Sequence, residues 1–181
     1  ATGMIVKTPK GYYDKFRSRI MFPITNLSGV PVAFTGRIFE EKGKKSLAGE
    51  NPAKYMNSPQ TLLYDKSNIL FGMDKAKISM GQKDTCIVVE GQMDLIMSHQ
   101  AGIVNAVAVS GTAFTENHLK KIMPLSNKII WSYDGDSAGF NASARAMELA
   151  LSYGMNVRLA ILPEEKDPAD LAKQNPELLK K

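Results

Sequence analysis

The stretch that decides the fold is Cys86-Ile87-Val88-Val89-Glu90-Gly91, in which four apolar residues lead into an acid and a glycine. A continuous apolar run of this kind is typical of a parallel strand that is buried on both faces. Comparable runs occupy residues 106–109, 128–132 and 157–162. The sequence therefore predicts four strands of one parallel sheet.

Helical patterns fill the intervals between these strands. They cover residues 94–100, the segment from Thr115 to just before Pro124, and residues 137–151, which Gly154 closes. Strands that alternate with helices predict an α/β fold, because each connecting helix packs back onto a face of the parallel sheet.

A different pattern precedes Cys86. Residues 20–24 and 32–39 predict the two strands of a hairpin, with a turn at residues 26–29. Residues 40–54 are rich in Lys, Glu and Gly and predict a loop, and residues 55–84 predict turns and a short helix. We therefore place a boundary near residue 84.

The composition is that of a globular protein of 181 residues, with 44% hydrophobic and 23% charged residues. One cysteine, Cys86, excludes a disulfide within the chain and is too few for a thiolate zinc site. Its position in a buried strand predicts a core residue. No apolar stretch approaches the roughly 18 residues that suggest a membrane span, and no signal sequence opens the chain, so we expect a cytoplasmic protein.

The charge is unevenly distributed along the chain. Residues 1–85 hold 14 Lys/Arg and 7 Asp/Glu, a net of +7, whereas residues 86–181 hold 9 Lys/Arg and 11 Asp/Glu, a net of −2. A basic half could attract phosphates and an acidic half could collect cations. The alternative is a chance asymmetry of the surface.

Acidic residues stand where the predicted strands end. Glu90 follows the first strand, Asp134 and Asp136 follow the third, and Asp167 and Asp170 follow the fourth. Open parallel sheets bind ligands outside the carboxyl ends of their strands, and converging carboxylates suit Mg²⁺. Since alternate residues of an extended segment point the same way, the Asp134/Asp136 pair can address one site. Capping of the following helix is the structural alternative, above all for Asp136.

A Glu that ends the first strand and an Asp-x-Asp that ends the third resemble the TOPRIM domain, which DnaG primases, type IA and type II topoisomerases and some nucleases share. The resemblance covers residues 85–170. It rests on Val88-Val89-Glu90-Gly91-Gln92-Met93-Asp94 and on Tyr133-Asp134-Gly135-Asp136-Ser137-Ala138-Gly139.

The upstream half is similar to the DnaG primases in particular, because several of their motifs follow in order. These motifs are at residues 13–24, 34–37, 54–59 and 70–72. In the second half, the segment Ser110-Gly111-Thr112-Ala113 between two strands resembles the family's Gly-Thr loop. The resemblance implies a smaller mixed α+β basic subdomain at residues 1–84, a TOPRIM domain with a parallel Rossmann-like sheet at 85–170, and the start of a C-terminal helical region at 171–181.

The resemblance also implies an activity and a site. The activity would be synthesis of short RNA primers from NTPs on a single-stranded DNA template. Glu90 would be the general base or a metal ligand. The acids that would hold Mg²⁺ or Mn²⁺ are Glu90, Asp134, Asp136, Asp167 and Asp170. The residues that would contact nucleotides or DNA are Arg17, Arg19, Arg37, Lys54, Asn57 and Lys66.

One departure from the family concerns the last acids. Many primases have Asp-Pro-Asp after the fourth strand, whereas this chain has Asp167-Pro168-Ala169-Asp170, so the second acid is displaced by one residue. The chain shows no zinc-binding module and little of a helicase-binding domain. We therefore expect an excised core or a minimal relative. The expected partners, a replicative helicase and a single-strand-binding protein, would engage regions absent here.

Other functions remain open at this stage. A TOPRIM scaffold would bind nucleic acid without catalysis, and a topoisomerase fragment would need a nucleophilic tyrosine from another domain. A phosphatase with an aspartyl nucleophile also uses Asp-x-Asp, but that motif normally follows the first strand. Metal-dependent primer synthesis would distinguish the primase from all three.

Overall fold

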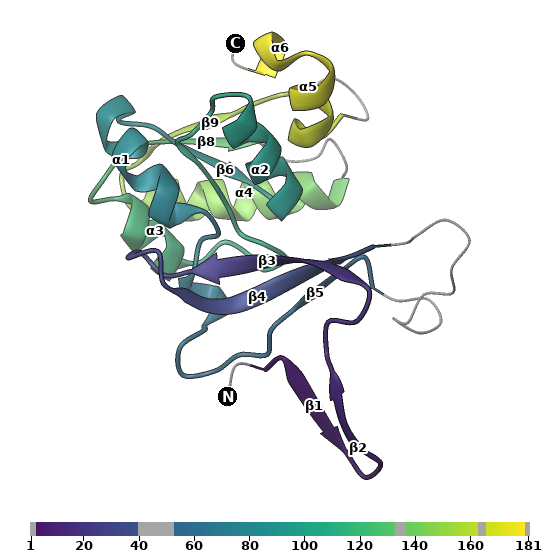
Figure 1. The fold of residues 1–181 in the computed structure, drawn as a ribbon. Helices are drawn as coiled ribbons and strands as arrows, with labels where there is room; N and C mark the ends of the chain where they lie inside the picture. Colours follow the sequence, from purple (N-terminus) through teal and green to yellow (C-terminus); the bar gives the residue numbers. More distant parts are fainter. Residues whose placement is uncertain (1–2, 40–52, 133–136, 163–165, 180–181) are drawn as a thin grey trace. The chain divides into compact units, whose positions relative to one another are not determined.

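The computed structural model describes residues 3–39, 53–132, 137–162 and 166–179, and it shows two compact units, residues 1–65 and 66–181 (Figure 1). The 3-10 turn η1 (Lys66–Asn68) and helix α1 (Met73–Lys83) belong to the second unit. A functional division at residue 84 stays a prediction.

The first unit is built from antiparallel strands. β1 (Ile5–Thr8) and β2 (Gly11–Asp14) form a hairpin, and β3 (Arg19–Thr25), β4 (Pro31–Ile38) and β5 (Tyr55–Asn57) form a three-stranded sheet in that order. The predicted hairpin of residues 20–24 and 32–39 is confirmed as β3 and β4. Its turn is held by Asn26, whose Oδ1 accepts hydrogen bonds from the backbone of Ser28 and Val30 at 3.0 and 3.1 Å.

The second unit contains the predicted parallel sheet. Its strands are β6 (Cys86–Val89), β7 (Ala106–Ala108), β8 (Lys128–Ser132) and β9 (Asn156–Leu159), and their order is β7-β6-β8-β9. All three neighbouring pairs are parallel. The α/β fold class is therefore confirmed, and β6, the strand on which the prediction was founded, lies inside the sheet.

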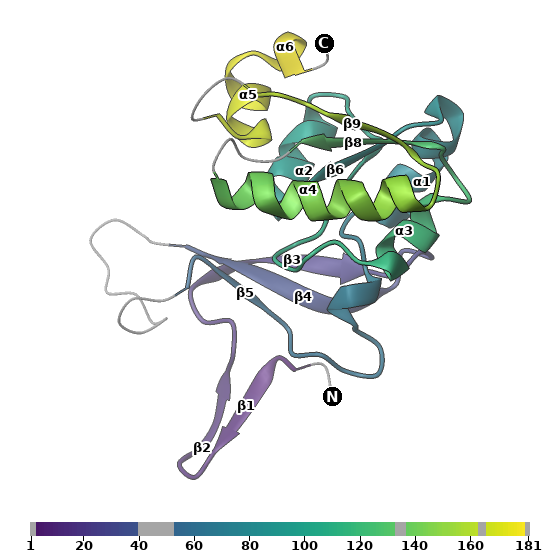
Figure 2. The same ribbon diagram turned by 180° about the vertical axis from the view of Figure 1, so that it is seen from behind.

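Helices cover both faces of this sheet. They are α2 (Gln92–Gln100), α3 (Glu116–Ile122), α4 (Ser137–Ser152), α5 (Pro168–Gln174) and α6 (Pro176–Leu179), in addition to α1. Figure 1 shows α2 in front of the sheet, and Figure 2, from behind, shows α4 in front of it.

The main core lies between the sheet and three of the helices. Side chains of α1, α3 and α4 pack there on one face of β6 and β8, where alternate residues are fully buried. Cys86, Val88, Ile129 and Trp131 form that face, each with 0% exposure. Cys86 is thus a core residue, as its place in a buried strand predicts, and Trp131 is a core residue as well. No helix of the described residues is long and apolar enough to cross a membrane.

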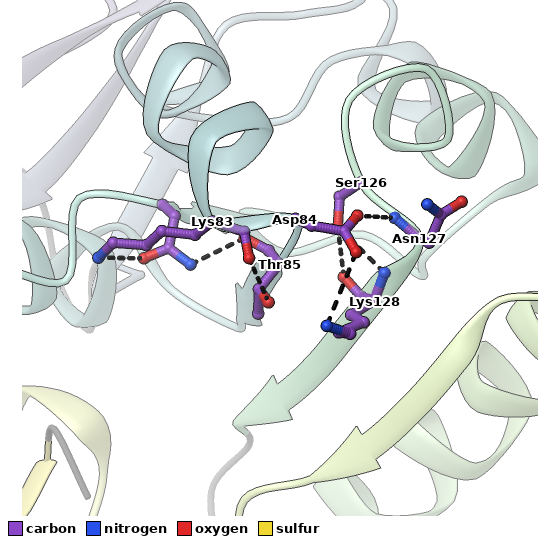
Figure 3. Close-up of polar contacts among 7 residues, drawn as sticks. Lys83, Asp84, Thr85, Ser126, Asn127 and Lys128 are labelled. Carbon is purple, nitrogen blue, oxygen red and sulfur yellow. Dashed lines mark hydrogen bonds and ion pairs between the residues drawn. The ribbon is translucent and has the colours of Figure 1, made fainter.

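Polar side chains connect the loops at the amino edge of the sheet through hydrogen bonds and an ion pair (Figure 3). Asp84 accepts a hydrogen bond from the backbone N–H of Asn127 at 2.7 Å and forms an ion pair with Lys128 at 3.7 Å. Asn105 donates to the Thr85 carbonyl at 2.8 Å. These contacts join the loops that lead into β6, β7 and β8 at this edge of the sheet.

Candidate active site at the carboxyl ends of the parallel strands

Glu90 follows β6 at the point where the order of the sheet reverses. In the sheet, Val89 pairs with Ala108 of β7 on one side and with Ser132 of β8 on the other. The chain leaves β6 for β7 on one side and later returns to β8 on the other, which makes this the switch point where open α/β sheets bind ligands. Glu90 is half-buried, and its Oε1 atom is buried.

The turn after Glu90 is closed by Asp94. The backbone N–H of Gly91 donates to Asp94 Oδ2 at 3.0 Å. A Cβ on residue 91 would lie 2.8 Å from that oxygen, so glycine is the residue that lets the carboxylate approach. Asp94 is 8% exposed and caps the N-terminus of α2, the helix that begins two residues after Glu90. Sequence reasoning assigned Asp94 no role, although an acid three residues after a helix N-cap is a known capping signal.

The loop after β7 lies against the same turn. The backbone N–H of Ser110 donates to the Glu90 carbonyl at 3.0 Å. Ser110 and Gly111 both adopt left-handed backbone, with φ of 56° and 79°. The predicted Gly-Thr loop thus borders the Glu90 backbone.

Two of the predicted metal ligands, Asp134 and Asp136, lie outside the described residues. The last described residue before them is Ser132, which pairs with Val89 in the sheet. The carboxyl ends of β6 and β8 are therefore neighbours, as the prediction of a shared site requires.

The two acids after β9 have other contacts in the structure. Asp167 is the N-cap of α5, and its Oδ1 accepts a hydrogen bond from the backbone N–H of Asp170 at 2.6 Å. Asp170 is exposed in the first turn of that helix. No group of three or more His, Cys, Asp or Glu that could hold a metal is found among the described residues, which exclude the segment 133–136. Metal binding by Asp167 and Asp170 stays a prediction.

The predicted nucleic-acid contacts of the first unit fall on two faces of the β3-β4-β5 sheet. Arg19 pairs with Ile38, whereas Arg37 pairs with Ile20 and Tyr55, so the two arginines point to opposite faces. Asn57 lies two residues from Tyr55 on β5 and shares the Arg37 face. The sheet therefore brings Arg37 and Asn57 together and separates them from Arg19.

Arg19 serves the structure of its own unit. Its Nη1 donates to the Gly36 carbonyl at 3.0 Å and lies 3.5 Å from the Lys54 carbonyl. Burial lowers the pKa of the guanidinium. By contrast, Arg17 is exposed and lies 4.9 Å above the ring of Tyr13.

The remaining predicted contacts differ in their surroundings. Arg37 donates to the Tyr55 hydroxyl at 3.3 Å and faces its ring, and the Lys54 side chain is exposed. Lys66 belongs to the second unit, where its carbonyl lies 3.0 Å from Nε2 of the buried His118. His118 thus has a structural role.

Two family models match the chain in succession. The N-terminal domain of the DNA primase catalytic core matches residues 1–77, and a Toprim-like domain matches residues 87–172. A DNA primase of Clostridium acetobutylicum is 36% identical over 174 residues, which are 96% of this chain and 27% of that protein. The chain spans about a quarter of the length of the curated relatives it matches.

Solved structures agree with this. The zinc-binding and RNA polymerase domains of the Aquifex aeolicus primase superpose with a TM-score of 0.86 at 34% identity, covering 99% of this chain and 43% of that one. A DnaG primase catalytic domain bound to single-stranded DNA superposes with a TM-score of 0.82 at 36% identity, covering 96% of this chain and 55% of that one.

The parallel sheet of the second unit, with Glu90 at the end of its first strand, is thus a Toprim-like domain. The first unit matches the N-terminal domain of the primase catalytic core, and DNA primases are similar to the chain along almost its whole length. The chain therefore belongs to the family of DnaG-type primases and matches part of their catalytic core. This family implies dependence on a divalent metal in general.

Proposed function

We propose that this chain catalyses nucleotidyl transfer in the DNA-templated synthesis of short RNA primers. The observation that carries the proposal is the position of Glu90, at the switch point of the sheet and beside the end of β8. The similarity to DNA primases supports this function over a topoisomerase fragment or a non-catalytic scaffold.

In the proposed reaction the 3′-hydroxyl of a ribose attacks the α-phosphate of an incoming NTP. A new P–O bond forms, the bond to the β-phosphate breaks, and pyrophosphate leaves. Glu90 has two roles open to it, as acceptor of the hydroxyl proton or as a ligand that fixes a metal. Both roles need a carboxylate at this position.

The buried Oε1 of Glu90 fits a metal site, because a hard oxygen ligand held at the edge of the sheet is what Mg²⁺ or Mn²⁺ prefers. A bound cation would neutralise charge on the phosphates. The residues that would hold it are Glu90, Asp134, Asp136, Asp167 and Asp170.

The basic first unit would supply contacts to the template and the nucleotide. Arg17 and Lys54 are exposed and suited to phosphates, and Arg37 and Asn57 share one face of the sheet. A similar solved structure is a DnaG primase catalytic domain bound to single-stranded DNA, which supports a DNA template here. We further propose that the protein acts in the cytoplasm. A replicative helicase and a single-strand-binding protein would engage regions outside this chain.

The test is incorporation of labelled ribonucleotides on a single-stranded template with Mg²⁺ or Mn²⁺. Glu90→Gln keeps the shape and removes the charge, so we expect a loss of about 100-fold or more. Asp84→Asn is the matched control, because it removes one charge at the amino edge of the same sheet. It should leave incorporation unchanged.

Two results would contradict the proposal. Equal incorporation by wild type and Glu90→Gln would remove Glu90 from catalysis. Folded wild-type protein that binds template but incorporates nothing at saturating template would favour the scaffold.

A further inference from the structure

The β1–β2 hairpin has no role in the chemistry proposed above, yet its surface is unusual. Every residue of β2 is exposed. Tyr12 is 72% exposed, and Ile5 on the facing strand is 63% exposed. A two-stranded ribbon has little core of its own, so this apolar surface does not stabilise the hairpin by burial.

Cationic side chains lie beside the two tyrosine rings of the hairpin. Lys7 pairs with Tyr12 across the two strands, which puts both side chains on one face, and Lys7 Nζ lies 6.0 Å from the centre of the ring. Tyr13 lies on the opposite face, where Arg17 covers its ring. Tyr12 therefore offers the more exposed aromatic ring, with a cation beside it.

The charge of the segment is almost entirely positive. Residues 3–19 contain one acid, Asp14, which is exposed on β2. The cations of the same segment are Lys7, Lys10, Lys15, Arg17 and Arg19. Such a surface is complementary to a polyanion.

The hairpin is held at both ends. At its tip, the Thr8 hydroxyl donates to the Gly11 carbonyl at 3.0 Å. At its base, the Lys15 N–H donates to the Met4 carbonyl at 2.8 Å. A Cβ on Gly3 would lie 2.4 Å from the ring of Pro59, so the start of the chain also packs against the segment after β5. The aromatic and basic side chains are thus presented on an ordered element.

We propose that the β1–β2 hairpin is a contact site for single-stranded DNA, in which a base stacks on Tyr12 while Lys7 and Lys10 pair with phosphates. Exposed aromatic rings beside cations are the means by which proteins hold single strands without sequence preference. A duplex is a poorer fit, because its bases are already stacked on one another. This inference rests on the proposed function, since it assumes a single-stranded template.

The experiment titrates the protein with a 16-residue oligothymidylate and uses Tyr12→Trp as a reporter. The one native tryptophan, Trp131, is 0% exposed and gives a constant background. Stacking should quench the emission of the introduced indole, and the affinity should equal or exceed that of wild type. Tyr12→Leu keeps an apolar side chain but removes the ring, so binding should weaken about 5-fold or more.

The charged contacts are tested by a double variant. Lys7→Ala with Lys10→Ala should weaken binding and lower the slope of log affinity against log salt by about 1.4, since each phosphate contact on a single strand contributes about 0.7. The control pair is Lys173→Ala with Arg158→Ala, two exposed cations of the second unit. An equal loss in the control pair would show that only net charge matters, and would overturn the proposal.

The outcomes separate this inference from the proposed function. Wild-type binding that is unchanged by Tyr12→Leu, with no quenching in Tyr12→Trp, would overturn the hairpin contact alone. No wild-type binding to the single strand would overturn template binding and the hairpin contact together. An equal effect of Tyr12→Leu on a 16-base-pair duplex would also contradict stacking. Circular dichroism of each variant verifies folding.

Discussion

Asp84 shows how much one side chain can do at a loop. Its φ of 45° is left-handed, a conformation that Asp and Asn tolerate better than other residues with a Cβ. Its carboxylate accepts the Asn127 N–H at 2.7 Å, and the ion pair with Lys128 spans 3.7 Å between two half-exposed side chains. The hydrogen bond and the backbone conformation should therefore matter more than the charge.

Two substitutions of Asp84 separate these contributions. Asp84→Asn keeps the accepting oxygen and the tolerance of left-handed backbone, so the free energy of unfolding should fall by less than about 1 kcal/mol. Asp84→Ala loses both, and the fall should be about 1–3 kcal/mol. Urea unfolding measures the two values. Equal losses would mean that the ion pair dominates.

Among the elements, helix α1 begins with an unusual requirement. It starts after Gly72, which has a φ of 79° and no side-chain cap. A Cβ on Gly72 would lie 2.4 Å from Cδ2 of Leu95, a buried residue of α2. Backbone conformation and space both demand glycine here.

A pair of Gly→Ala variants in this one helix should change stability in opposite directions. Gly72→Ala should lower the free energy of unfolding by about 2–4 kcal/mol, through left-handed strain and displacement of Leu95. Gly81 lies inside α1, and an added Cβ would come no closer than 3.8 Å to another part of the protein. Gly81→Ala should raise stability by up to about 1 kcal/mol. Thermal unfolding of both proteins provides the comparison, and destabilisation by Gly81→Ala would contradict this account.

The elements that could be predicted from sequence are those with one-sided or complete burial. β6 and β8 were recognised because their apolar runs are buried on both faces. The β1–β2 hairpin was missed because β2 is exposed throughout, which leaves no alternation to detect. Helix α1 was predicted only as a short helix, since three buried residues on a largely polar segment make a weak pattern.

The candidate site was predictable to the same degree. Glu90 adjoins a strand that the sequence identifies, so its place at the sheet edge was correctly predicted. Arg19 and Arg37 were grouped as nucleic-acid contacts by the resemblance to DnaG primases, but strand register puts them on opposite faces. Register could not be inferred because residues 20–24 are uniformly apolar or proline.

For the whole molecule, the net charge is concentrated in one compact unit. Residues 1–65 hold 10 Lys/Arg and 5 Asp/Glu, a net of +5, and residues 66–181 hold 13 of each, a net of zero. Salt-dependent attraction of a polyanion should therefore belong to the first unit.

The exposed and the structural cations of that unit should respond differently to substitution. Arg17→Ala with Lys54→Ala should weaken binding to single-stranded DNA and reduce its salt slope by about 1.4, without lowering the unfolding midpoint. Arg19→Ala should cost about 1–2 kcal/mol of stability, because the Gly36 carbonyl loses its charged donor. Fluorescence anisotropy at several salt concentrations, paired with urea unfolding, tests both. An unchanged salt slope in the double variant would argue against the prediction.

The burial of Cys86 makes its thiol a probe of how often the parallel sheet opens. This single thiol is 0% exposed in β6, an inner strand of the parallel sheet, and burial raises its pKa, so the reactive thiolate is suppressed in the folded state. An aromatic disulfide reagent should therefore label it only when the central sheet comes apart, and the labelling rate should report how often that happens. Rapid labelling under native conditions would show that β6 opens locally. A second cysteine placed on the exposed surface, in contrast, should accept a dye selectively while the native thiol stays in place.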